Sequence, residues 1–159
     1  MSQDVNMERA NEVYNNIVNH LNSIGWSFDR HDEDLVITTG IKSKDLPINF
    51  LIVVNAKNEV VQFISKLPFN VEEDKRVEAA IAVCVANYGL VDGSFDYDIG
   101  DGEIRYRLTC SYRGNSIGGD VIEYIIAAAS QTVEEYNDRF LMISEGVITL
   151  EKFVEMDNG

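Results

Sequence analysis

The stretch KLPFNVEEDKRVEAAIAVCVANY, residues 66 to 88, leaves a β-rich run, passes a proline and continues into a segment that is apolar on nearly every side. Asn70 and Glu73, three residues apart, match a capping box, so we expect a helix to begin there. Pro68 disfavours helical geometry at Leu67 and keeps that residue extended. The sequence therefore predicts a strand that stops before a sharply started helix.

Two apolar stripes run along this predicted helix at helical spacing. The stripe of larger residues is expected to lie on a sheet, and it consists of Val77, Ile81, Cys84, Val85 and Tyr88. The stripe of smaller residues leaves room for a second helix to approach closely, and it consists of Ala79, Ala82, Val83 and Ala86. That second helix belongs either to the same chain or to another copy in an isologous dimer. These four small residues are the predicted dimer or partner interface.

Upstream of this stretch the pattern predicts one helix and four strands. Residues 7–24 repeat apolar side chains at helical spacing, and Gly25 follows as a C-terminal cap. Residues 26–40 predict a hairpin that turns at Asp32 and Glu33, and residues 48–65 predict two more strands. The first strand of that second pair carries apolar residues on both faces, which indicates a central position in the sheet.

Downstream, Asp101-Gly102 is a preferred pair for a tight type I′ turn and predicts a hairpin. The resulting register places Tyr97 opposite Tyr106 on an apolar face. On the polar face it places two ion pairs, Asp98 with Arg105 and Asp96 with Arg107.

A third long helix follows the hairpin. One apolar stripe at helical spacing is expected to face the core, and it consists of Ile122, Ile125, Ile126, Ala129, Val133, Tyr136 and Phe140. Asp120 and Glu123 form another capping-box pattern, and Gly146 marks the helix end. Residues 149–156 predict a short terminal helix capped by Thr149. The whole order is α-β-β-β-β-α-β-β-α, which predicts an α+β fold: an antiparallel sheet with helices packed on one face.

Length and composition suit a single domain over residues 1–159, with a core of about residues 8–146. The net charge of −14 disfavours nucleic-acid and membrane-surface binding, because both targets are anionic. Cys84 and Cys110 lie among apolar neighbours and are expected to be buried free thiols. With no apolar signal core near the start of the sequence, we expect a cytoplasmic protein of bacterial type.

No catalytic or metal-binding pattern stands out. The two histidines have no partner ligand at metal-binding spacing, and the glycine-rich residues 113–121 match no phosphate-binding motif. We therefore expect no enzyme activity, no metal and no cofactor. Tyr97, Tyr106 and Tyr112 form a row on one strand face, which indicates either core packing or a ligand pocket between the sheet and the third helix.

Residues 8–146 resemble the YbjN-like family of bacterial domains, which share the type III secretion chaperone-like fold. The resemblance is carried by KLPFNVEEDKRVEAA, by ANYGLVDGSFDYDIGDGEIRYRL and by the following helix that ends at Gly146. Glu72 departs from the pattern, where a proline is expected, and both residues suit a first helical turn.

The resemblance implies a non-catalytic homodimer that binds an unidentified protein partner. Proteins of this family are described as sensory transduction regulators or chaperone-like proteins, so we expect a chaperone-like or signalling regulator. The alternative is a small-ligand sensor domain that uses the tyrosine row.

Overall fold

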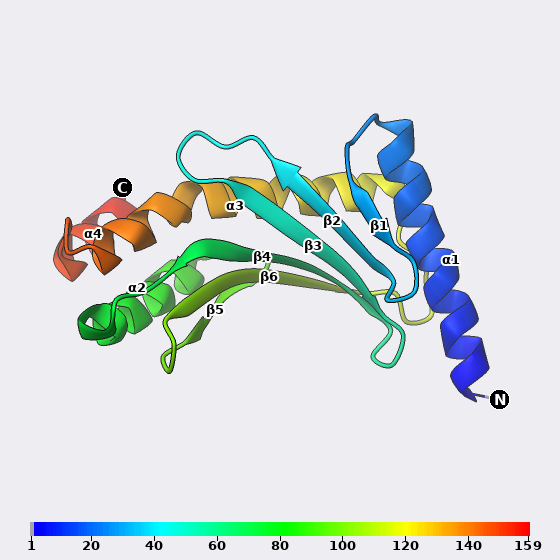
Figure 1. Ribbon diagram of the computed structural model, residues 1–159, viewed down its shortest axis with the longest axis horizontal. Coiled ribbons are helices and arrows are strands. Elements are labelled where there is room, and N and C mark those ends of the chain that lie inside the picture. The colour runs from blue at the N-terminus through cyan, green and yellow to red at the C-terminus, as the bar shows by residue number, and fades with distance from the viewer. Residues whose placement is uncertain (1) are drawn as a thin grey trace.

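The computed structural model describes residues 2–159, which form a six-stranded antiparallel sheet with helices packed on one face (Figure 1). The elements, in chain order, are α1 (Ser2–Ser23), β1 (Asp29–His31), β2 (Val36–Ile41), β3 (Ile48–Asn55), β4 (Val60–Asn70), the 3-10 helix η1 (Glu73–Lys75), α2 (Arg76–Gly89), β5 (Ser94–Asp98), β6 (Glu103–Ser111), α3 (Gly119–Ser144) and α4 (Leu150–Asp157). The predicted α+β class and element order are confirmed.

The strands lie in the order β1-β2-β3-β4-β6-β5. Along β3 the side chains alternate between the helix-covered face, where Phe50 and Ile52 are buried, and a face that points to solvent, where Leu51 is 42 % exposed. The central position predicted for this strand is confirmed. Only one of its two apolar faces is covered, so the other is an open sheet surface.

The helices divide the covered face between them. The long helix α3 runs behind the sheet across most of its length, α1 packs at one end, and α2 and α4 lie at the other (Figure 1). The buried apolar side chains of α3 include every residue of the predicted stripe: Ile122, Ile125, Ile126, Ala129, Val133, Tyr136 and Phe140. Within residues 2–159, none of the helices combines the length and apolar character needed to cross a lipid bilayer.

The predicted start of the second helix is wrong. Strand β4 continues through Pro68 as far as Asn70, and the Asn70 side chain donates to the carbonyl oxygen of Asp101 at 3.1 Å instead of capping a helix. Pairing with β6 accounts for this, because Val71 N still donates to Gly102 O at 2.9 Å. A sheet partner distant in the sequence therefore overrides the local capping preference, and η1 precedes α2.

The ends of the later helices agree with the prediction only in part. Asp120 makes no capping hydrogen bond, and Gly118 is the N-cap of α3. Gly146 has φ of +68°, as expected for the residue that terminates a helix in left-handed geometry. The Thr149 side chain accepts from Lys152 N at 3.2 Å, so the predicted cap of α4 is confirmed.

The β5–β6 hairpin forms with a register two residues from the predicted one. Tyr97 lies opposite Ile104, and Asp96 lies opposite Arg105. Gly102 N donates to Asp98 O at 2.8 Å, so the turn is longer than the predicted tight turn. A shift of two residues keeps every side chain on its predicted face, because side chains alternate with period two.

Candidate functional site

Helix α2 faces the opposite way from the prediction. The small residues Ala79, Ala82 and Ala86 are fully buried, and Val83 is nearly so. They lie against α3, α4 and β5 of the same chain. The small side chains allow these elements to pack closely around α2, so this side is already covered within one chain. The small stripe therefore packs against helices of the same chain, which is one of the two predicted alternatives, and it is not a free surface for a second copy in this fold. The prediction that the large stripe lies on the sheet is wrong.

Four of the five residues of the large stripe are exposed, whereas Val85 is partly buried against the core. We call Val77, Ile81, Cys84 and Tyr88 the α2 ridge. Val77 is 67 % exposed, Ile81 is 46 % exposed and Tyr88 is 95 % exposed, while Cys84 is also exposed. Their spacing of four, three and four residues places them in one line along the helix. The ridge contains no charged side chain and is the exposed apolar face of an otherwise packed helix.

The cysteines differ from each other in exposure. Both are free thiols, but Cys84 lies on the α2 ridge, so the prediction that it is buried is wrong. Cys110 is partly buried against the core, and this burial raises the pKa of its thiol. Among the described residues, no group of three or more His, Cys, Asp or Glu side chains is arranged to hold a metal ion.

The tyrosine row points into the core. Tyr106 and Tyr112 are fully buried, and Tyr97 is partly buried. Each hydroxyl donates to a backbone carbonyl: Tyr97 to Arg76 at 3.0 Å, Tyr106 to Asp92 at 2.8 Å and Tyr112 to Asn55 at 3.4 Å. Burial raises the pKa of all three hydroxyls. These contacts fit the core-packing interpretation, since the hydroxyls are already used within the protein.

A hollow of about 790 Å³ opens on the solvent-facing side of the sheet, lined by β3 and β4 and also by β2 and residues 27–29. We call it the β3–β4 hollow. Its lining residues are Ser27, Phe28, Asp29, Thr38, Thr39, Gly40, Asn49, Phe50, Leu51, Ile64, Lys66, Leu67, Pro68, Phe69 and Asn70. Most of its walls are apolar or uncharged, and its two charged side chains have opposite sign. No sequence motif indicated it, because its lining residues come from several segments that are distant in the sequence.

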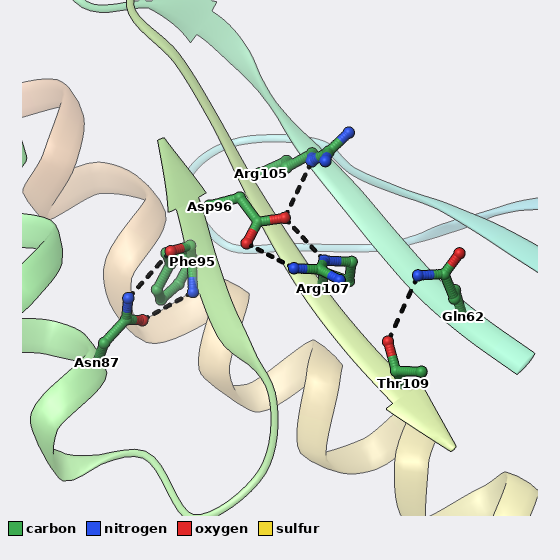
Figure 2. A network of polar contacts seen from close by, with 7 residues as sticks. All are labelled: Gln62, Asn87, Phe95, Asp96, Arg105, Arg107 and Thr109. Carbon is green, nitrogen blue, oxygen red and sulfur yellow. Dashed lines mark hydrogen bonds and ion pairs between the residues drawn. The ribbon is translucent and has the colours of Figure 1, made fainter. Parts of the chain in front are cut away.

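Beside this hollow, the open face carries a small charged network on β5 and β6 (Figure 2). Arg107 donates to Asp96 through Nε at 2.8 Å and through Nη2 at 3.0 Å, and Arg105 Nε donates to the same carboxylate at 3.2 Å. These bonds, chiefly those from Arg107, hold the pKa of Asp96 below its usual value. The predicted pair of Asp96 with Arg107 is confirmed. The predicted pair of Asp98 with Arg105 is wrong, because the register shift places Arg105 opposite Asp96.

The Asn87 side chain binds the backbone of β5, a role that the sequence pattern did not predict. Its side-chain amide donates to Phe95 O at 2.9 Å and accepts from Phe95 N at 2.7 Å (Figure 2). The amide thus takes the place of a neighbouring strand at the outer edge of β5. The only available signal was the Asn-Tyr-Gly-Leu segment at the helix end, which carried the family resemblance.

Comparison with known proteins supports the fold and the family. A structural match to the crystal structure of YbjN from E. coli has a TM-score of 0.59 and 11 % identity, covering 79 % of this chain and 92 % of the other. A match to the crystal structure of the ExsC–ExsE complex has a TM-score of 0.53 and 14 % identity, covering 80 % and 92 %. At these identities the matches show the fold alone, and they confirm the predicted chaperone-like architecture. Among curated proteins, no relative matches the chain.

The family follows from the sequence model rather than from the structural matches. The model of the YbjN family, described as "Putative bacterial sensory transduction regulator", matches residues 14–142. That range begins within α1, includes the whole sheet and ends near the last turn of α3. Because the match covers most of the chain, this protein belongs to the YbjN family.

Proposed function

We propose that this protein is a non-catalytic protein-binding module that acts as a homodimer, in a chaperone-like or signalling role. The observation that carries the proposal is the α2 ridge. Large apolar side chains in a continuous exposed line favour a protein contact, because their burial is favourable in free energy. The family description supports a regulatory role, and one solved structure of this fold is a complex of two proteins.

A second copy of the chain is the simplest occupant of the ridge. In an isologous dimer the same patch of both copies meets across a two-fold axis. The uncharged apolar ridge of one copy can therefore pack against the ridge of the other without oppositely charged residues having to be aligned. The acidic net charge of −14 opposes association of two copies. The ridge itself adds no charge to that repulsion.

The test is the mass of the protein in solution, measured by size-exclusion chromatography with light scattering. We expect the wild type at micromolar concentration to show twice the 17.9 kDa chain mass. Ile81→Arg places a charge in the ridge and should give the single-chain mass. Asn15→Arg adds the same side chain at an exposed position of α1, at the far end of the molecule, and should leave the dimer intact (Figure 1).

Thiol labelling of Cys84 provides a second measurement of the same contact. In the dimer the ridge is covered, so Cys84 should react slowly with a thiol reagent, and Ile81→Arg should restore fast labelling. A wild type that elutes as a single chain and labels as quickly as the variant would refute the homodimer.

A further inference from the structure

The backbone pairing between β3 and β4 stops while both strands continue. Paired residues run from Asn55 with Val60 to Leu51 with Ile64. Strand β3 extends further to Ile48, and β4 extends further to Asn70. In Figure 1 the two arms part beyond this point. Within the described residues, no ladder pair joins the two arms, so the sheet is split and each arm has an inner edge without a strand partner.

The β3–β4 hollow is bordered by residues of both arms. In a strand, successive side chains point to opposite faces, so a hollow on a sheet face contacts alternate residues. This hollow is lined by consecutive residues of both arms, 49–51 on β3 and 66–70 on β4. The hollow also contacts residues 38–40 of β2, so it extends over the sheet face as well as beside the two arms. The residues of β3 and β4 that have no ladder partner in each other are among those that line it.

The outer edges of the sheet are less available for an added strand. At β5, the Asn87 side chain occupies both backbone hydrogen-bonding groups of Phe95. At the other edge, β1 is only three residues long. Short and blocked edges are the usual protection against unwanted strand pairing. The split between β3 and β4 is the longer free edge that remains.

The chemistry of the hollow defines its occupant. Its walls include Phe28, Leu51, Ile64 and Phe69, which suit apolar side chains. The ammonium group of Lys66 is already paired with Glu103, so the hollow offers no free cation to attract an acidic ligand. The protein as a whole carries a net charge of −14, which attracts basic groups from solution. A segment with an apolar centre and basic ends therefore suits the apolar walls of the hollow and the acidic charge of the whole protein.

We propose that the β3–β4 hollow binds an extended polypeptide segment, apolar at its centre and basic at its ends, which adds to the free edge of β4 as a strand. The inference rests on the proposed protein-binding function and names its mode and the chemistry of the partner. At about 3.4 Å per residue, the free arm from Ser65 to Asn70 offers roughly 20 Å of edge. Pro68 lacks an N–H group, which keeps the added strand short and limits edge-to-edge pairing of copies.

The probe for the test is a short fluorescein-labelled peptide in which valine alternates with threonine between lysine-rich ends. Fluorescence anisotropy with the full-length protein gives its Kd, and amide hydrogen exchange gives its location. We expect binding to slow exchange in residues 48–50 and in residues 66–70 apart from Pro68, which has no amide proton. The same peptide with N-methyl groups on alternate residues cannot pair as a strand, so its Kd should rise at least tenfold. A peptide with glutamate-rich ends should also bind more weakly.

Variants of the protein separate the hollow from general charge effects. Leu51→Arg places a cation in the hollow and should raise the Kd at least tenfold. Val53→Arg introduces the same charge on the same strand face, outside the lining residues, and should leave the Kd within about twofold. Ile81→Arg should also leave the peptide Kd unchanged, because the α2 ridge is a separate surface.

Each contrary outcome identifies what has failed. Equal affinity for the N-methylated peptide would overturn strand addition. Protection confined to α2, or equal loss of binding in both arginine variants of β3, would overturn the hollow as the site. If none of the peptides binds the protein, the inference is overturned altogether. The dimer measurements do not depend on these peptides, so the homodimer proposal would stand or fall separately.

Discussion

At the scale of single residues, one glycine and one asparagine determine how neighbouring segments of the backbone meet. Gly102 has φ of +83°, and a Cβ atom there would lie 2.4 Å from the carbonyl oxygen of Val71. Only glycine fits this close approach. Asn87 closes the edge of β5 with its amide. Both residues act on backbone groups, so neither role is visible in the hydrophobic pattern.

Replacing Gly102 with alanine should therefore be costly. We expect Gly102→Ala to lower the free energy of unfolding by about 1–3 kcal/mol, because it adds both backbone strain and a clash with Val71. Urea denaturation measures the change. Gly89→Ala is the matched control, since Gly89 has no heavy atom within 4 Å of the added Cβ and no positive φ. The explanation is wrong if the two substitutions have the same effect.

Asp96 should make stability depend on pH in the acid range. Its pKa is lowered in the folded protein by Arg107, so its ion pairs contribute fully above the unfolded pKa of about 4. That contribution is lost as the pH falls below about 4 and through the folded pKa. Urea midpoints at a series of pH values should therefore fall less steeply in Asp96→Asn than in the wild type. Parallel curves would show that the pairs contribute nothing measurable.

At the scale of elements, α2 and the β5–β6 hairpin show where a correct pattern leaves a choice open. A helix that is apolar on nearly every side can bury either stripe, and both assignments satisfy its periodicity. The hairpin has the same ambiguity, since registers two residues apart bury the same face. The contact of Gly102 with Val71 accompanies the longer turn, whereas Asp101-Gly102 alone favoured the shorter one.

The burial of the small stripe predicts opposite responses on the two sides of α2. Ala82 is fully buried, so Ala82→Leu should overpack the contact with its neighbours and cost about 1–3 kcal/mol of stability. Val77→Leu, on the exposed ridge, should change stability by less than about 0.5 kcal/mol. Thermal and urea denaturation at one low protein concentration decide this comparison. The reverse ranking would mean that the ridge is the buried side.

At the scale of the whole molecule, the sheet has one covered face and one open face, and the two candidate contact surfaces lie on different sides. Helices α3 and α4 pack beneath α2, where Phe153 of α4 is fully buried beside Phe140 of α3. The ridge remains outside this packing, and the β3–β4 hollow opens on the sheet face. Self-association through α2 would therefore leave the hollow free for a different chain.

A homodimer should also make thermal stability depend on concentration. Because dimer formation stabilises the folded state by mass action, a tenfold rise in protein concentration should raise Tm by about 2–4 °C. Ile81→Arg should show a Tm that does not change with concentration. Differential scanning calorimetry over a wide concentration range provides the measurement. A constant Tm for the wild type would argue against a dimer that is coupled to folding.

The sequence alone was sufficient to predict the number of strands and α-helices, their order along the chain, the buried stripe of α3 and the cap at Thr149. These features depend on spacing and on neighbours a few residues apart, which are present in the sequence itself. The family resemblance was also readable there, because it lies in continuous segments.

The folded chain alone decided the orientation of α2, the register of the β5–β6 hairpin, the continuation of β4 through Pro68 and the split beside it. Each of these depends on groups distant in the sequence that meet in space: α3 and α4 against Ala82, Val71 against Gly102, and β6 against Asn70. Local propensities differ by about 1 kcal/mol or less between the alternatives, and burying a surface or completing a strand ladder outweighs that difference.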